Sequence, residues 1–149
     1  MDIKSKNRWP SSALSNFAPH LFVIDGVECA SMEGLLQALK FDEMHIQIKV
    51  CKLVGIKAKL HGKERDETWK DAQKLWWQGR TFNRHGKSYQ KFLDRAFEAL
   101  SKNVEFQKAL LATGNAVLTH SIGKSKRYDT VLTEAEFCSR LIKIRKQLN

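Results

Sequence analysis

The sequence predicts one α+β domain in which helices predominate, and three observations predict it. Apolar residues recur at helical spacing in several stretches from residue 32 onward. The only two prolines, Pro10 and Pro19, both precede the first of these stretches, so the helices are not interrupted. One hairpin pattern stands ahead of the helices. A chain of 149 residues suits a single hydrophobic core and is too short for two comfortable domains, so we expect residues 1–149 to form one unit.

Local signals place the elements along this chain. In LFVIDGVEC, residues 21–29, β-branched and aromatic residues flank Asp25-Gly26, a dipeptide typical of a type I′ turn, which predicts a β-hairpin. Ser31 is a suitable N-cap for a helix over 32–41. Further helices are expected over 43–54, 66–77, 88–102 and 104–113, with a short strand at 116–121. Thr133 and Glu136 form a capping-box pattern that begins a last helix ending near residue 147. Residues 1–12 are expected to be a loose extension.

The charge balance is the strongest compositional observation. Lys and Arg number 26 against 16 acidic residues, which gives a net charge of +10 and a pI near 9.7. Such a surface attracts polyanions through its long-range field and through counterion release. A phosphate-bearing partner is therefore favoured, and the alternative is a merely solubilising surface.

Other features concern the compartment of the protein. No stretch approaches 18 consecutive apolar residues, so no membrane contact through a spanning helix is expected, and residues 1–12 contain no secretory apolar region. The three scattered cysteines form no zinc spacing and suit a reducing environment. We therefore expect a cytoplasmic protein without a metal site or another cofactor.

A polar stripe on the helix over 32–41 carries the first candidate chemistry. Glu33, Gln37 and Lys40 fall within about 60° of one another on a helical wheel, opposite a row of leucines. An ordinary solvated face would look the same. If the stripe instead closes a cleft, burial would favour a neutral, nucleophilic lysine, and the glutamate one turn or two away would move protons.

The sequence resembles the NADAR family, also called the YbiA-like or DUF1768 family. The likeness lies in LSNFAPHLFVIDGVECASMEGLLQALKF, in EFQKALLATGNAVLTH and, more weakly, in FCSRLIKIRKQL, so that it extends from about Leu14 to Arg145. The first segment is similar to the family's order of Leu-Ser-Asn-Phe, hairpin and Ser-x-Glu-x-x-x-Gln-x-x-Lys. The resemblance implies an α+β fold of the YbiA type and hydrolysis of an N-glycosidic bond.

For the leading substrate class, the resemblance implies removal of ADP-ribose from guanine in DNA, or in RNA. Lys40 would form a Schiff base with ribose C1′, and Glu33 would handle protons or position the sugar. Among the substrate-binding residues, Ser15 and Asn16 would bind the sugar or its phosphates, Gln37 would hydrogen-bond ribose, and Phe17 would be either a stacking platform or part of the core. ADP-ribose would be the product, a DNA ADP-ribosyltransferase toxin would belong to the same system, and the setting would be an antitoxin or a phage counter-defence. The alternatives are an N-glycosidase of ribosylated riboflavin-pathway intermediates and a non-catalytic module that binds ADP-ribose or nucleic acid.

Three other segments supply candidates for binding. LWWQGRTFNRHGKSYQ places aromatics, among them Trp77, beside Arg84 and Lys87, which suits nucleic acid, although a tryptophan at a helix end is more often core. GIKAKLHGKERD, residues 55–66, is expected to be a basic loop, and His120 follows the strand at 116–121 as a substrate-binding candidate. The late segment lacks the family's Asp-x-x-Trp-Gly, and Asp129, Glu134 and Glu136 are the acidic substitutes.

Overall fold

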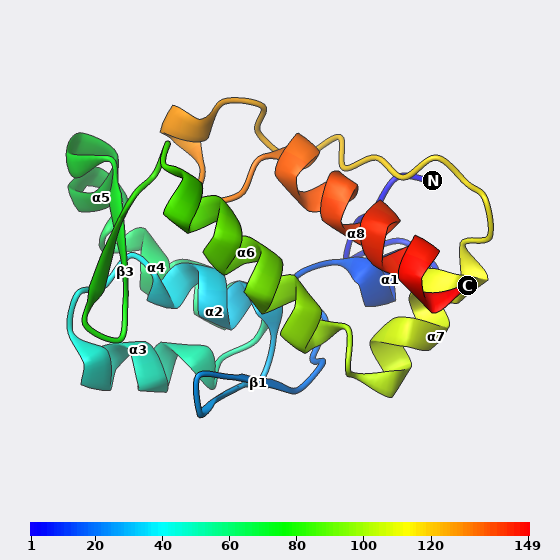
Figure 1. Ribbon diagram of the computed structural model, residues 1–149, viewed down its shortest axis with the longest axis horizontal. Coiled ribbons are helices and arrows are strands. Elements are labelled where there is room, and N and C mark those ends of the chain that lie inside the picture. The colour runs from blue at the N-terminus through cyan, green and yellow to red at the C-terminus, as the bar shows by residue number, and fades with distance from the viewer.

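The computed structural model describes residues 1–149 as eight α-helices, one 3₁₀ turn and two two-stranded antiparallel sheets (Figure 1). The helices are α1 (Ser11–Leu14), α2 (Met32–Ala38), α3 (Met44–Cys51), α4 (Gly55–Lys63), α5 (Asp66–Ala72), α6 (Lys87–Leu100), α7 (Val104–Ala112) and α8 (Glu134–Leu148). The strands are β1 (Phe22–Ile24), β2 (Val27–Cys29), β3 (Lys74–Trp77) and β4 (Arg80–Asn83), and the 3₁₀ turn η1 covers Arg127–Asp129. The predicted α+β class with helices in the majority is confirmed.

The first hairpin and α2 form as their local signals predict. β1 and β2 pair through Phe22 with Cys29, and both turn residues between them have positive φ, 50° at Asp25 and 77° at Gly26. This is the backbone that a two-residue type I′ turn requires. Ser31 Oγ then accepts a 3.0 Å hydrogen bond from the N–H of Gly34 and donates one of 2.9 Å to the carbonyl of Leu53. The cap therefore both starts α2 and ties it to the end of α3.

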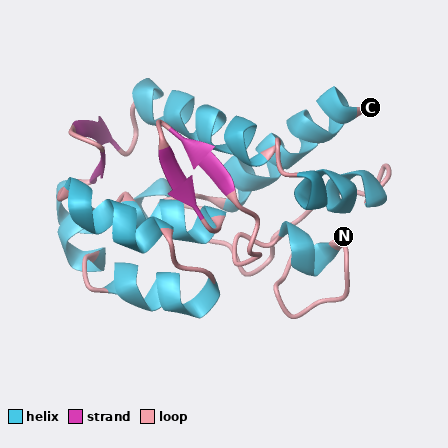
Figure 2. Cartoon of the chain, turned by 90° about the horizontal axis from the view of Figure 1, so that it is seen from below, coloured by secondary structure: helices cyan, strands magenta, loops and turns pink.

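Three elements differ from the sequence prediction. Residues 55–63 form the helix α4 rather than a loop, and residues 74–77 form the strand β3 rather than the end of a helix. Helix α5 stops because Gln73 adopts the left-handed conformation, with a φ of 50°. The chain then turns through Gln78 and Gly79, both at positive φ, so that β3 and β4 make a second hairpin, which lies apart from the first (Figure 2). The expected strand at 116–121 is reduced to a single bridge.

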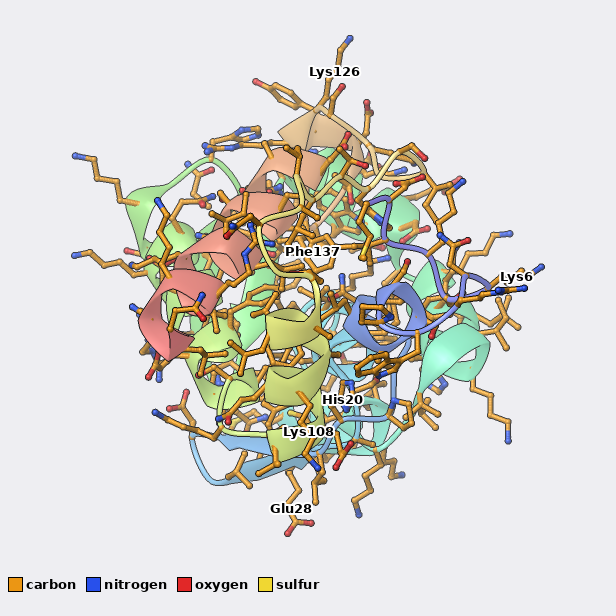
Figure 3. All side chains as sticks on the ribbon, turned by 90° about the vertical axis from the view of Figure 1, so that its right-hand side faces the viewer. Lys6, His20, Glu28, Lys108, Lys126 and Phe137 are labelled. Atoms are coloured by element: carbon orange, nitrogen blue, oxygen red, sulfur yellow. The ribbon has the colours of Figure 1, made fainter.

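The core collects the apolar faces of the longer helices. Helix α6 contributes Phe92, Leu93 and Phe97, and α8 contributes Phe137 and Leu141, all of them almost fully buried. Figure 3 shows Phe137 inside the molecule, whereas the charged ends of Lys6, Glu28 and Lys126 project outward on three different sides. The capping box of α8 is present, with Thr133 and Glu136 exchanging both hydrogen bonds.

Residues 1–12 are a packed part of the domain rather than a loose extension. Ile3 is fully buried, and its N–H donates to the carbonyl of Thr119 over 2.8 Å. Asp2 forms the parallel bridge with Thr119 and accepts hydrogen bonds from the backbone and hydroxyl of Ser121. The expectation failed because the segment is mostly polar, and the partners that hold it, Thr119 and Ser121, lie more than a hundred positions away in the sequence.

Two further observations bear on the sequence-based expectations. None of the helices is long and apolar enough to cross a membrane. Cys29, Cys51 and Cys138 are all buried and unpaired, as small core residues.

Candidate active site

The polar stripe, made of Glu33 and Gln37 on α2 and Lys40 two residues after its end, forms one wall of a cleft with a volume of about 560 Å³. Helices α4 and α5, the loop at 15–17 and the segment from His120 to Leu132 supply the other walls. The cleft brings together all but one of the eight site residues expected from the sequence: Ser15, Asn16, Phe17, Glu33, Gln37, Lys40 and His120. The stripe therefore lines a cavity instead of a solvated surface.

Lys40 is the buried cation of this cleft. The residue is only 7% exposed, and its Nζ donates a 2.5 Å hydrogen bond to Oδ1 of Asp66 at the start of α5. Burial lowers the pKa of Lys40 below the ordinary lysine value, because the charged form loses hydration, while the contact with Asp66 opposes that effect only in part. The amine of Lys40 is thus easier to deprotonate than that of an exposed lysine.

Glu33 shows the opposite shift for the same physical reason. Burial raises the pKa of Glu33, although the hydrogen bond from Gln37 and the charge of Lys40 act in the other direction. Gln37 Nε2 donates to Glu33 Oε1 over 2.8 Å and so fixes the orientation of the carboxyl group. In this arrangement Gln37 positions Glu33, which is a different role from the expected hydrogen bond to ribose.

The Leu-Ser-Asn-Phe loop is held against the first turn of α2. The carbonyl of Asn16 accepts a 3.0 Å hydrogen bond from the N–H of Glu33, and Ser15 Oγ accepts one of 3.2 Å from the N–H of Phe17. The ring of Phe17 lies against Gly55 at the start of α4. The side-chain amide of Asn16 makes no hydrogen bond within the protein, so it is free to contact a ligand.

His120 reaches the cleft from the opposite side and is held by the N-terminal segment. Its Nδ1 donates to the carbonyl of Ile3 over 2.7 Å, and its backbone N–H donates to Oε1 of Glu134 over 3.0 Å. Because a carbonyl can only accept, the neutral ring carries its proton on Nδ1 and leaves Nε2 as an acceptor. Packing of residues 1–12 therefore sets the orientation of a cleft residue.

Some cleft residues were not found by sequence reasoning. Trp69, which is buried with no partner for its Nε1–H, lines the cavity beside Asp66 and Lys70 of α5, and the last two are the residues that were missed. No local signal identifies them, because Asp66 is 26 positions from Lys40 and only tertiary packing brings the two together. Lysines 40, 59, 63, 70 and 124 outnumber the acidic residues Glu33, Asp66 and Asp129 around the cleft.

Trp77 is the one predicted site residue that the cleft does not include. It is buried in the core, where its Nε1 donates to Oδ2 of Asp25 over 2.9 Å. The centroids of its ring and the ring of Phe92 are 5.7 Å apart. Trp77 points inward because side chains alternate along β3, where Leu75 and Trp77 are buried, Trp76 is half-buried and Lys74 is exposed.

Arg84 is likewise a structural residue and not part of a nucleic-acid groove. It is fully buried and forms a bidentate pair with Glu136, with its Nη2 2.7 Å from Oε1. Burial alone would raise the pKa of Glu136, but hydrogen bonds from Arg84, Thr133 and Gln90 lower it to about 2. Of the three acidic substitutes considered for the late segment, only Asp129 lines the cleft.

The comparisons with known proteins agree with this architecture at two levels. The fold is that of the E. coli protein YbiA, whose NMR structure superposes with a TM-score of 0.64 at 19% identity, covering 99% of this chain and 83% of the other. The resemblance to the YbiA-like (NADAR) family is thereby confirmed for the fold. The chain belongs to the Bacteriophage protein GP30.3 family, whose pattern matches residues 8–146. A relative in Enterobacteria phage T4, an uncharacterized 17.1 kDa protein in the Gp30-rIII intergenic region, is 38% identical over 99% of this chain and 98% of its own length.

Proposed function

We propose that the protein is an N-glycoside hydrolase that removes ADP-ribose from guanine bases of nucleic acid. The observation that carries the proposal is the pairing of Lys40 and Glu33 on one wall of one cleft, with the pKa of the base lowered and the pKa of the acid raised. Opposed shifts of two titratable groups in a cavity are typical of acid–base catalysis and much rarer on an ordinary amphipathic helix.

The chemistry divides into two steps that Lys40 and Glu33 can support. In the first, the neutral amine of Lys40 attacks ribose C1′, the bond from C1′ to the guanine amino nitrogen breaks, and protonated Glu33 gives its proton to that nitrogen. The ribose ring then opens as one proton of the nitrogen bound to C1′ moves to O4′, which leaves a protonated imine between Lys40 and C1′. In the second step, water adds to C1′ with the Glu33 carboxylate as base, and ADP-ribose leaves as the free sugar with Lys40 restored.

Asp66 has a defined part in this scheme. Lys40 must lose a proton before it attacks, and the carboxylate in direct contact with its Nζ is that of Asp66, not that of Glu33. Asp66 therefore holds the amine in place and accepts its proton, while Glu33 serves the leaving group. Two carboxylates on two different helices let the two proton transfers occur without competing for one residue.

The remaining features of the cleft fit a substrate that carries a diphosphate. A volume of about 560 Å³ falls within the roughly 300–1,000 Å³ of small-molecule sites. The lysines at its mouth favour phosphate, and Asn16 and His120 Nε2 offer hydrogen-bonding groups for ribose. The net charge of +10 favours a polynucleotide over a free metabolite such as a ribosylated riboflavin intermediate. In a bacteriophage protein, this reaction would reverse the modification of DNA by an ADP-ribosyltransferase toxin in the cytoplasm of the host.

A hydrolysis assay tests the proposal directly. The purified protein is incubated with a DNA oligonucleotide carrying ADP-ribosylated guanine, and release of intact ADP-ribose with restored guanine is followed by mass spectrometry. We expect release by the wild type and none by Lys40→Arg, which keeps the charge but supplies no neutral amine to attack C1′. A borohydride-trapped adduct on Lys40 should form only in the wild type. If the folded wild-type protein releases no ADP-ribose even at high concentration, the proposal is contradicted. The remaining candidates are then a riboflavin-type substrate and a non-catalytic binding module.

A further inference from the structure

Helix α4 presents a mixed apolar and basic face to the mouth of the cleft. Ile56, Lys59, Leu60 and Lys63 all line the cavity, and their spacing of i, i+3, i+4 and i+7 puts them on one side of the helix. The other side is closely packed, because Ala58 and Gly62 are buried where α4 meets α2. Because the opposite side of α4 packs against α2, the helix cannot rotate, and the mixed face points toward the cleft.

The apolar members of this face are exposed in a way that folding does not explain. Ile56 is 56% exposed and Leu60 is 57% exposed, although both are large aliphatic residues. Across the cleft, Ile122 is 66% exposed in the segment that also supplies Lys124. Scattered apolar surface residues are common, but here three of them border the two lips of a single cavity, which is typical of a binding surface.

The lysines of α4 are also free for a ligand. Neither Lys59 nor Lys63 forms an ion pair or a hydrogen bond through its side chain, and α4 contains no acidic residue. By contrast, Lys102, just after α6, and Lys108 of α7 pair with Glu98 and Glu105. The positive charges of Lys59 and Lys63 are thus unpaired within the protein, as a polyanion partner requires.

We propose that this lip surface, defined as Ile56, Lys59, Leu60 and Lys63 with Ile122 and Lys124 opposite, binds a single strand of nucleic acid on both sides of the modified guanine. The proposal rests on the proposed function and specifies how its polymeric substrate is held. Enzymes that act on a base take it out of the stack, and aliphatic side chains can separate neighbouring bases while cations hold the phosphates. Ile56, Leu60 and Ile122 fill the space of the extruded nucleotide, and the lysines contact the flanking phosphates.

The test compares an ADP-ribosylated single-stranded DNA oligonucleotide with the ADP-ribosylated guanosine alone, since only the former reaches the lips. We expect Ile56→Gln with Leu60→Gln to lower kcat/KM for the oligonucleotide about tenfold more than for the nucleoside. Val104→Gln with Leu111→Gln on α7, which does not line the cleft, is the matched control and should change neither. Equal losses on both substrates would overturn the proposal, because the residues would then act on the ADP-ribose itself.

The lysines are tested by binding, which does not depend on catalysis. Anisotropy of a fluorescent, unmodified single-stranded DNA should show weaker binding by Lys59→Gln with Lys63→Gln and a salt dependence shallower by about 1.4 in the log–log slope. Lys102→Gln with Lys108→Gln removes the same net charge and should leave both values near those of the wild type. Equal weakening of DNA binding by the two double variants would overturn the proposal that the lip surface binds the strand. If the wild type hydrolyses neither substrate, the proposed reaction is wrong. The binding comparison then still tests, independently of catalysis, whether the lip surface binds single-stranded DNA.

Discussion

Gly62 of α4 lies so close to Gln37 of α2 that a methyl group on it would stand 1.8 Å from Gln37 Oε1 and 2.7 Å from Cδ. The same Gln37 donates through Nε2 to Glu33, so the contact between the two helices sets the position of the proposed acid. The absence of a side chain at Gly62 is thus a requirement of the site, even though glycine weakens the helix that contains it.

Gly62→Ala should therefore destabilise the protein and impair the site together. Overpacking of a buried contact costs about 1–3 kcal/mol, and Gln37 must leave Glu33 to make room. Urea denaturation gives the stability, and the oligonucleotide assay gives the activity.

A double-mutant cycle with Gln37→Ala separates the clash from the helix propensity. Without the amide, alanine at position 62 should cost less than in the wild type, because only the Cβ of residue 37, 2.9 Å from the new methyl group, still crowds it. Loss of stability of the same size in both backgrounds would show that Gly62 does not act through Gln37.

Local signals explain why the first hairpin and α2 could be predicted from the sequence. The turn at Asp25-Gly26 and the cap at Ser31 depend on residues within a few positions of one another. The elements that failed depend on distant partners. The N–H of Trp76 donates to the carbonyl of Leu39, which holds β3 as a strand where the sequence continues a helical pattern. Helix α4 contains two glycines, which argue against a helix until the approach to α2 makes Gly62 necessary.

In the candidate site, too, the residues set by local sequence could be predicted and those set by tertiary contacts could not. The stripe of Glu33, Gln37 and Lys40 could be read from one helix, because its spacing is local. Asp66 could not be assigned to Lys40, since nothing in the sequence sets the angle between α2 and α5. Trp77 was predicted to bind substrate because it is an aromatic residue near basic residues. The alternation of side chains along β3 directs its ring into the core instead.

Ile3→Ala should cost about 2–4 kcal/mol of unfolding free energy, because a fully buried side chain loses its contacts and leaves a cavity. The carbonyl of Ile3 also holds His120, so loosening the segment should raise KM as well. Leu21→Ala is the control, at a position that is 59% exposed, and should change neither quantity by more than the experimental error. A small effect of Ile3→Ala would mean that residues 1–12 are held by their hydrogen bonds alone.

Lys40→Met should leave stability at pH 7 unchanged or higher while abolishing turnover. The pKa of Lys40 is lower in the folded protein than in the unfolded chain, so the ammonium destabilises the fold at every pH below the folded pKa. This cost fades as the pH rises toward the ordinary lysine value, and the advantage of methionine should fade with it. Asp66 keeps about a third of its side chain in solvent, so it tolerates the loss of its partner. A loss of more than about 1 kcal/mol would show that the ion pair with Asp66 outweighs desolvation.

Glu33→Gln tests the assignment of acid and base through the pH dependence of kcat/KM. The substitution keeps an acceptor for Gln37 Nε2, so the geometry of α2 should remain, and the rate should fall about 10²–10⁴-fold. Burial raises the pKa of Glu33 and lowers that of Lys40, which brings the two values closer and enlarges the fraction of molecules with a neutral amine and a protonated carboxyl. The wild-type profile should be bell-shaped, since low pH protonates Lys40 and high pH removes the proton from Glu33. In Glu33→Gln the decline at high pH should disappear, while the rise that reports Lys40 remains. Persistence of both limbs would assign the acid to another group, and Asp66 would be the first to examine.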